Sequence, residues 1–335
     1  MTSASIFRIF ALSLALSGPV HAGIVPDEAV KDAEGGYFHK ALAIVAPLAK
    51  DHPQDAEVQY RYGQALSGIG KADDAIAVLK AAVSLDPKNG AYHRALGEAY
   101  GAKAQQGFED GSTGMFGAMG LMKSARLEFE SATELAPADV DAHVDLAMYY
   151  IVVPGLLGGS YSKAHAEEDI IDKLDPIQGL QIRANEAGNK DDVATGVALL
   201  KQAIAQDKTS GSLIALGLLY AGAKQYDDAL HAFHDAQAKD PKAYMAWYQI
   251  GKIAGLAKKN YDEGIEALKH YIAIGDVVPD TLPSIAFAHF RLGNIYAAQG
   301  HTDQASTEYR TASDLNTDND PDLAAKLKDA EARLK

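Results

Sequence analysis

Residues 210–243 read SGSLIALGLLYAGAKQYDDALHAFHDAQAKDPKA, and this stretch decides the fold. Gly217 is followed by Tyr220 three residues later, and Ala229 is followed by Phe233 four residues later. Spacings of three and four residues place side chains on one face of an α-helix. Small residues let two helices approach closely, and large residues fill the space beside them. The stretch therefore predicts two helices packed on each other, closed by a proline that cannot continue a helix.

The same pattern recurs along the chain. Gly63 and Gly97 are 34 residues apart, as are Gly217 and Gly251, and Gly293 belongs to a further copy. In three copies an alanine follows twelve residues after the glycine: Ala75, Ala229 and Ala305. Small and large positions that recur in phase indicate a repeat in which each pair of helices packs on the next. We expect the aspartates before these alanines to cap the second helix of each pair and to favour its dipole.

These positions together resemble the tetratricopeptide-repeat family. The resemblance implies an all-α fold, a right-handed superhelical α-solenoid of about eight helix pairs with a C-terminal capping helix. The repeats are expected at about 23–55, 56–89, 90–139, 140–176, 177–209, 210–243, 244–283 and 284–317, with the cap helix at 320–335. Residues 154–159 also resemble a Pro-Gly-x-x-Gly-Gly signature of some exported bacterial members, which implies a cell-envelope location.

The N-terminus has the features of a secretory signal. Residues 1–8 carry one positive charge and no acid, and Val20-His21-Ala22 has the small-x-small order of a cleavage site. The apolar stretch from Ile6 to Leu16 has 11 residues, whereas a membrane span needs about 20. The sequence therefore predicts a signal peptide at 1–22, cleavage after Ala22, and a periplasmic or secreted protein without stable membrane insertion.

The composition argues against several kinds of partner and site. The formal net charge is −14 and no basic run occurs, so we expect no nucleic-acid partner. The chain has no cysteine, which excludes disulfides, thiolate zinc sites and cysteine nucleophiles. H-E-x-x-H and G-x-S-x-G motifs are absent, and the glycine-rich stretch 152–164 lacks the order of a phosphate-binding loop. The protein is predicted not to be an enzyme and to need no cofactor.

Two histidine groups have side chains that could bind a metal. His231 and His234 lie three residues apart beside Asp235, but two or three groups on one helix face do not complete a tetrahedral site. His165 and Asp169 lie four residues apart, a spacing typical of a surface pair. We therefore predict no metal site.

An insertion at residues 103–120 interrupts the repeat and carries Met115 and Met119, with Met122 just beyond it. Methionine-rich apolar surface suits adaptable binding. Apolar residues at helical spacing more often belong to a core, so a lengthened helix that packs on the preceding repeat is the favoured interpretation. A second insertion at 275–283 is expected to reset the stacking of the repeats.

Binding is the usual function of this fold, because the first helices of the pairs line a groove. The candidate peptide-binding residues are Tyr60, Gln64, Arg94, Val144, Met148, Ile214, Leu218, Tyr248, Lys252, Phe290 and Asn294. The family's carboxylate clamp of Lys and Asn at adjacent repeats is missing, so an acidic C-terminal peptide is not the expected ligand. The leading hypothesis is a protein- or peptide-binding scaffold of the bacterial envelope. A carrier of an apolar small molecule or lipid is the alternative, and the groove residues could instead pack against their own neighbours.

Overall fold

The computed structural model describes residues 23–109, 111–317 and 320–334. Within these residues the secondary structure is helical, without any strand, which confirms the predicted all-α solenoid fold class. The predicted signal peptide at 1–22 lies outside the described residues. No helix of the described chain is long and apolar enough to cross a membrane.

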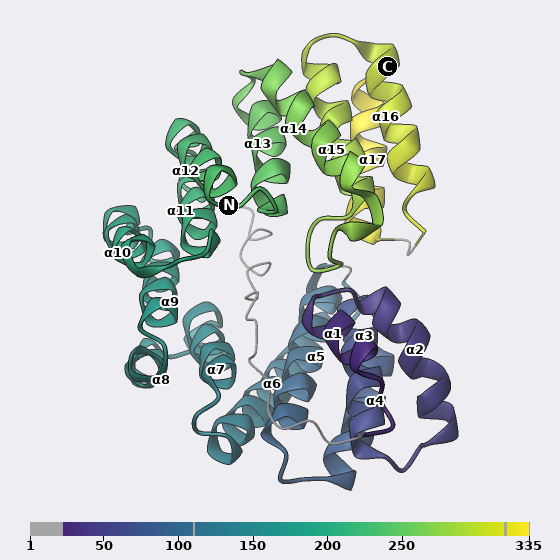
Figure 1. The fold of residues 1–335 in the computed structure, drawn as a ribbon, viewed down its shortest axis with the longest axis vertical. Helices are drawn as coiled ribbons and strands as arrows, with labels where there is room; N and C mark the ends of the chain where they lie inside the picture. Colours follow the sequence, from purple (N-terminus) through teal and green to yellow (C-terminus); the bar gives the residue numbers. More distant parts are fainter. Residues whose placement is uncertain (1–22, 110, 318–319, 335) are drawn as a thin grey trace. The chain divides into compact units, whose positions relative to one another are not determined.

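The helices follow one another in hairpins (Figure 1). In chain order they are α1 (Asp27–Glu34), α2 (Phe38–Asp51), α3 (Ala56–Gly68), α4 (Ala72–Leu85), α5 (Gly90–Glu109), α6 (Gly114–Leu135), α7 (Val140–Val152), the 3-10 helix η1 (Gly155–Leu157), α8 (Tyr161–Leu174), α9 (Pro176–Asn189), α10 (Val193–Gln206), α11 (Gly211–Gly222), α12 (Tyr226–Lys239), α13 (Tyr244–Ala257), α14 (Tyr261–Ile274), the 3-10 helix η2 (Gly275–Val277), α15 (Ile285–Ala298), α16 (Thr302–Asp314) and α17 (Pro321–Arg333).

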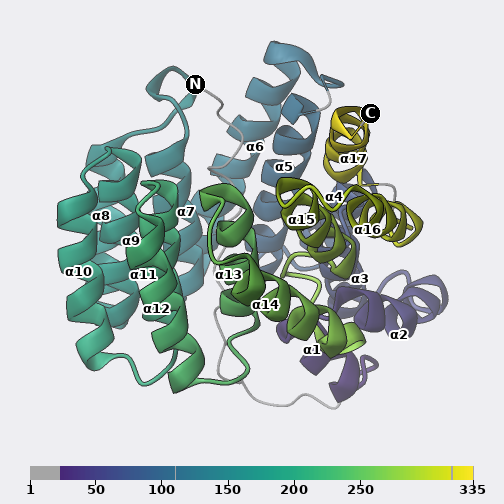
Figure 2. The same ribbon diagram turned by 90° about the horizontal axis from the view of Figure 1, so that it is seen from above.

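The chain divides into two compact units. Unit 1 runs up to Ile182 and includes Pro279–Thr281, and unit 2 comprises Arg183–Val278 and Leu282–Lys335. In unit 1 α3 packs on α4, α5 on α6, and α7 on α8; in unit 2 α11 packs on α12, α13 on α14, and α15 on α16. Figure 2 shows α10, α11 and α12 side by side, in agreement with their packing contacts. Burial between successive helices thus builds the core of each unit.

The recurring glycines lie where the two helices of a pair cross. A Cβ atom at Gly217 would lie 2.6 Å from the ring of Phe233, and one at Gly63 would lie 2.5 Å from Leu79. Equivalent contacts join Gly97 to Phe129, Gly251 to Leu268 and Gly293 to Tyr309. Real Cβ contacts are essentially never closer than 3.0 Å. The glycines therefore let each first helix press against a large, buried side chain of its second helix.

The second helices do not begin at the aspartates that the sequence predicted as their N-caps. The second helix α4 begins at Ala72, so Asp73 and Asp74 lie inside its first turn, and the capping residue Lys71 makes no side-chain cap bond. The expectation that these aspartates act as N-caps was therefore wrong, although acids in the first turn still favour the helix dipole. Aspartates cap other helices instead: Asp139 accepts hydrogen bonds from two backbone N–H groups of α7, and Asp192 accepts one from the first turn of α10.

Asp280 caps α2 within unit 1, although it comes 241 residues after the residue that it contacts. Its carboxylate accepts a hydrogen bond of 2.9 Å from the backbone N–H of His39 and lies 3.1 Å from Nδ1 of the same residue. Its own N–H donates to the carbonyl of Gly36 at 2.7 Å. The insertion at 275–283 thus supplies the polar contacts that the start of α2 lacks, since its own cap residue Tyr37 makes no side-chain cap bond.

The insertion at 103–120 lengthens both helices of one pair. Helix α5 has 20 residues and α6 has 22, whereas most of the other helices have 12 to 14. Met122 packs against the core of unit 1, whereas Phe108 and Phe116 near the turn are 77% and 86% exposed. The insertion therefore makes a long helical hairpin with two exposed aromatic rings near its tip.

Candidate binding face

The predicted groove residues lie on the first helices of successive pairs. In unit 1 these are α3, α5 and α7, and each contacts the next; in unit 2 they are α11, α13 and α15, which also contact in order. We call the predicted residues of α3, α5 and α7 and their polar neighbours the first-helix face of unit 1. They are Glu57, Tyr60, Arg61, Gln64, Arg94, Glu98, Asp141, Val144, Asp145 and Met148.

On α3 the face combines a buried aromatic ring with a half-buried polar network. Tyr60 stacks on Tyr92 with ring centroids 4.8 Å apart, and the guanidinium of Arg61 lies 4.9 Å from the centre of the Tyr60 ring. Arg61 donates to Glu57 at 2.7 Å and to Gln64 at 3.1 Å. Burial raises the pKa of Tyr60 to about 12, so its hydroxyl stays neutral. Tyr60 thus serves as packing, while Gln64 is only partly covered.

Arg94 of α5 is the centre of the face. Its Nε donates to Asp145 of α7 at 2.7 Å, and its Nη1 donates to Asp141 at 3.3 Å. A carboxylate oxygen of Glu98, one turn further on α5, lies 3.2 Å from the same Nε. The Arg94 and Glu98 side chains remain 27% and 36% exposed, whereas that of Asp145 is 5% exposed. One guanidinium therefore joins two first helices and stays within reach of solvent.

Three carboxyl groups around one guanidinium leave an excess of negative charge. Burial, together with a hydrogen bond to Asp145 and the charge of Asp141, raises the pKa of Glu98, although Arg94 acts in the opposite direction. Burial also raises the pKa of Asp145, against the opposing charge of Arg94. Because two neighbouring carboxylates repel each other, a proton shared between Glu98 and Asp145 relieves the repulsion.

Four further members of the predicted set lie inward. Val144 and Met148 of α7 are 3% and 8% exposed and belong to the core of unit 1. In unit 2 Tyr248 and Phe290 are 4% and 5% exposed and belong to one core cluster. These side chains fill space between the protein's own helices.

The other predicted residues of unit 2 lie closer to the surface. Arg291 donates to the hydroxyl of Tyr248 at 3.3 Å, and Tyr309 donates to the side-chain oxygen of Asn294 at 2.9 Å. Ile214, Leu218 and Lys252 are half-buried. The structure thus brings the predicted residues together within each unit, but about half of them pack inward.

Sequence reasoning placed Arg94 and Glu98 on the groove but missed the two aspartates of the Arg94 group. Asp141 and Asp145 are four residues apart on one helix, as are Arg94 and Glu98. These two i, i+4 pairs on successive first helices were the available signal. Arg94 and Asp145 are 51 residues apart, because the insertion lies between them, so the 34-residue period could not place them together.

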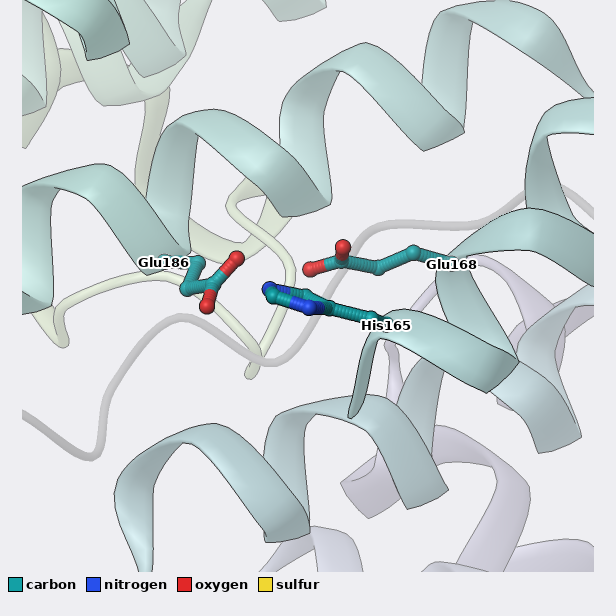
Figure 3. A group of neighbouring side chains, drawn as sticks. All are labelled: His165, Glu168 and Glu186. Atoms are coloured by element: carbon teal, nitrogen blue, oxygen red, sulfur yellow. The ribbon is translucent and has the colours of Figure 1, made fainter. Parts of the chain in front are cut away.

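Glu168 of α8 occupies a repeat position that is held by an apolar residue in other repeats. It comes four residues after Ala164, as Leu79 comes four after Ala75, and it is fully buried. Figure 3 shows Glu168 with His165 of the same helix and Glu186 of α9. The His-x-x-Glu spacing places His165 and Glu168 on one face of α8, where they offer ligand-type atoms within 4.8 Å of each other. Each of these side chains also has other interaction partners.

Paired helices with a small residue, mostly glycine, at their crossings and a partly exposed first-helix face define a helical repeat protein that offers a binding surface. Three family models described as tetratricopeptide repeat match the sequence, at residues 34–99, 214–279 and 288–319. The chain is therefore a tetratricopeptide-repeat protein, as the sequence pattern predicted.

Several solved structures are similar in fold. A thermophilic tetratricopeptide-repeat protein of Thermus thermophilus is 22% identical, with 65% of this chain and 90% of that chain covered and a TM-score of 0.40. A tetratricopeptide-repeat protein of Parabacteroides merdae is 15% identical, with 82% and 98% covered and a TM-score of 0.47. YrrB, described as having an unusual peptide-binding site, is 16% identical, with 60% and 95% covered and a TM-score of 0.35. A search of curated proteins found no match.

Proposed function

We propose that the protein is a non-catalytic scaffold or adaptor that binds a protein or peptide on its first-helix faces. The observation that carries the proposal is the Arg94 group, in which charged side chains of two successive first helices meet and stay partly exposed. Repeat proteins of this kind use successive first helices as an extended binding surface. Charged groups on such a surface set the register and the choice of partner more than they set affinity.

The reachable part of the proposed surface is mostly polar, with Ile214 and Leu218 as its half-buried apolar members. Gln64 and Lys252 are partly exposed, as are Arg94 and Glu98, whereas Tyr60, Val144, Met148, Tyr248 and Phe290 are buried. The buried side chains form a closely packed apolar layer beneath the surface, and the polar side chains above it offer hydrogen bonds to a partner. A carrier of an apolar molecule is not favoured, because the hollow bordered by Asp192, Lys201 and Tyr220 in unit 2 is open to solvent and partly charged.

The proposed location is the bacterial cell envelope. It is supported by the signal-like residues 1–22 and by the Pro-Gly-x-x-Gly-Gly order at 154–159, which is similar to that of exported family members. Intact-mass analysis of the protein from its native host tests the location. We expect Gly23 as the first residue, and a mass that retains residues 1–22 would overturn the proposed location.

Affinity capture with crosslinking and mass spectrometry from an envelope extract tests the binding function. The bait is the chain that begins at Gly23, compared with an Arg94→Ala variant and with a Lys80→Ala control on the second helix α4. A specific partner should be captured by the parent and by the control, and should be lost or reduced with Arg94→Ala. A partner that all three baits capture equally would place binding away from the first-helix face of unit 1.

A further inference from the structure

A buried histidine in unit 1 faces two hydrogen-bond acceptors at once. Nδ1 of His143 on α7 lies 2.6 Å from a carboxylate oxygen of Glu167 on α8. Nε2 of the same ring lies 3.2 Å from the carbonyl oxygen of Pro137, in the turn before α7. The imidazole side chain is only 5% exposed, so water offers little alternative to these partners. One ring therefore connects a turn, its own helix and the second helix of the pair.

The arrangement is repeated one helix pair earlier. Nδ1 of His93 on α5 lies 2.7 Å from Glu128 on α6, and Nε2 lies 3.1 Å from the carbonyl oxygen of Pro87. In both pairs the histidine stands four residues before the small crossing residue, and the glutamate stands three residues after the small alanine of the second helix. The repeat register therefore builds this contact twice.

The equivalent repeat position in unit 2 shows which partner donates the hydrogen bond between the side chain and the proline carbonyl. Trp247 stands four residues before Gly251, and its indole Nε1 donates to the carbonyl oxygen of Pro241 at 3.5 Å. An indole nitrogen can only donate. A side chain in this register thus gives a hydrogen to the proline carbonyl, as Nε2 of His143 is placed to do.

Two acceptors require two donors. A neutral imidazole has one donor nitrogen and one acceptor nitrogen, and only the imidazolium donates from both. With Nε2–H directed to Pro137, a neutral His143 would turn the lone pair of Nδ1 toward the carboxylate of Glu167. The hydrogen bond to Glu167 raises the pKa of His143, while burial opposes it. The hydrogen bond to the Pro137 carbonyl and the charges of Glu167 and Asp139 raise this pKa further.

We propose that His143 is a pH-sensitive clamp, which in its charged form ties the turn before α7 to α8 and in its neutral form releases one of the two. The proposal goes beyond the binding function and does not depend on it. A basic group whose pKa is raised on folding stabilises the fold below its unfolded pKa, near 6.5, and that contribution is lost as the pH rises through the folded pKa. The clamp therefore loosens as the pH rises through this raised pKa.

His289 of unit 2 provides an internal reference. Its Nδ1 lies 2.6 Å from Glu308, and this is its one hydrogen bond among the residues that the structure describes. A single acceptor needs a single ring proton, so a neutral His289 keeps its contact. Loss of the second proton should open the contact of His143 and leave that of His289 in place.

The test is a pH titration of the ¹⁵N-labelled chain from Gly23 onward, followed by long-range ¹H–¹⁵N spectra of the imidazole rings. The signals of His143 are assigned with a His143→Gln variant. Glu167→Gln is the decisive substitution, because the amide can donate to Nδ1 and so keeps the contact with a neutral ring. Far-ultraviolet circular dichroism checks that each variant is folded.

In the parent we expect His143 to titrate with a midpoint above the ordinary histidine value of 6.5, and this midpoint to shift to lower pH in Glu167→Gln. Amide exchange at the start of α7 should rise with pH, beyond the intrinsic increase, in the parent and not in the variant. A midpoint at or below 6.5 in the parent, or the same midpoint in both proteins, would overturn the proposal. The parent titration decides the question even if a variant does not fold.

Discussion

Replacing Gly217 tests whether the glycines at the helix crossings are packing contacts. A Cβ atom at this position would lie 2.6 to 2.8 Å from three ring atoms of Phe233, which is fully buried. Neither the ring nor the backbone of α11 can yield without disturbing its neighbours. Ala147 occupies the matching place in its repeat, yet the contact predicts that Ala at position 217 is strained and that Leu is not accommodated.

The expected change in the free energy of unfolding follows from two opposing effects. Alanine gains about 1 kcal/mol over glycine inside a helix, and overpacking a filled core costs about 1–3 kcal/mol. Gly217→Ala should therefore destabilise unit 2 by up to about 2 kcal/mol, and Gly217→Leu by about 3 kcal/mol or more. Gly222 is the matched control, because it ends the same helix and a Cβ there would meet nothing within 4 Å. Gly222→Ala should be neutral or stabilising by a few tenths of a kcal/mol.

Urea unfolding followed by circular dichroism compares the variants. With a slope of about 3 kcal/mol per molar urea, a difference of about 2 kcal/mol moves the midpoint by about 0.7 M. Because repeat arrays can unfold in parts, amide exchange should place the loss in α11 and α12. If Gly217→Ala raises the midpoint as much as Gly222→Ala does, the glycine is not a crossing contact, and α11 and α12 do not pack through Gly217 and Phe233.

Three further predictions concern single carboxyl groups. Glu98→Gln mimics the protonated acid: as the pH rises from about 4.5 to about 8, the parent should lose more stability than the variant does. After solvent screening, the difference at pH 8 should be on the order of 1 kcal/mol. Parallel urea midpoints of parent and variant across this range would contradict it. Asp139→Ala removes the cap of α7 and should cost about 1 kcal/mol in urea unfolding, whereas Asp74→Ala, within a first turn, should cost a few tenths. Asp280→Ala should speed amide exchange at His39, and unchanged protection there would show that the distant cap is not formed in solution.

The sequence predicted the helix pairs and their crossings well because these depend on local patterns. Gly217 and Phe233 come 16 residues apart in one helical hairpin, so periodicity alone brings them together. The same local reasoning misplaced the start of α4, because acids near a helix start serve equally as caps or as first-turn residues.

The binding face was harder to predict. Val144 and Met148 were assigned to the groove by their register but are buried, since periodicity gives the angle around a helix and not what packs over it. The partner of Arg94 is Asp145, beyond an insertion that breaks the repeat, and Asp280 caps a helix that begins more than 200 residues earlier. Such long-range pairs follow from the fold and not from a spacing in the sequence.

Site-specific photocrosslinking in the native host tests the proposed binding on the first helices most directly. A photoreactive residue is placed in turn at Gln64, partly exposed on α3, and at Asp74, exposed on the second helix α4 of the same pair. We predict that position 64 crosslinks to a distinct protein and that position 74 does not. A partner captured equally at both positions, or at position 74 alone, would contradict a binding surface on the first helices.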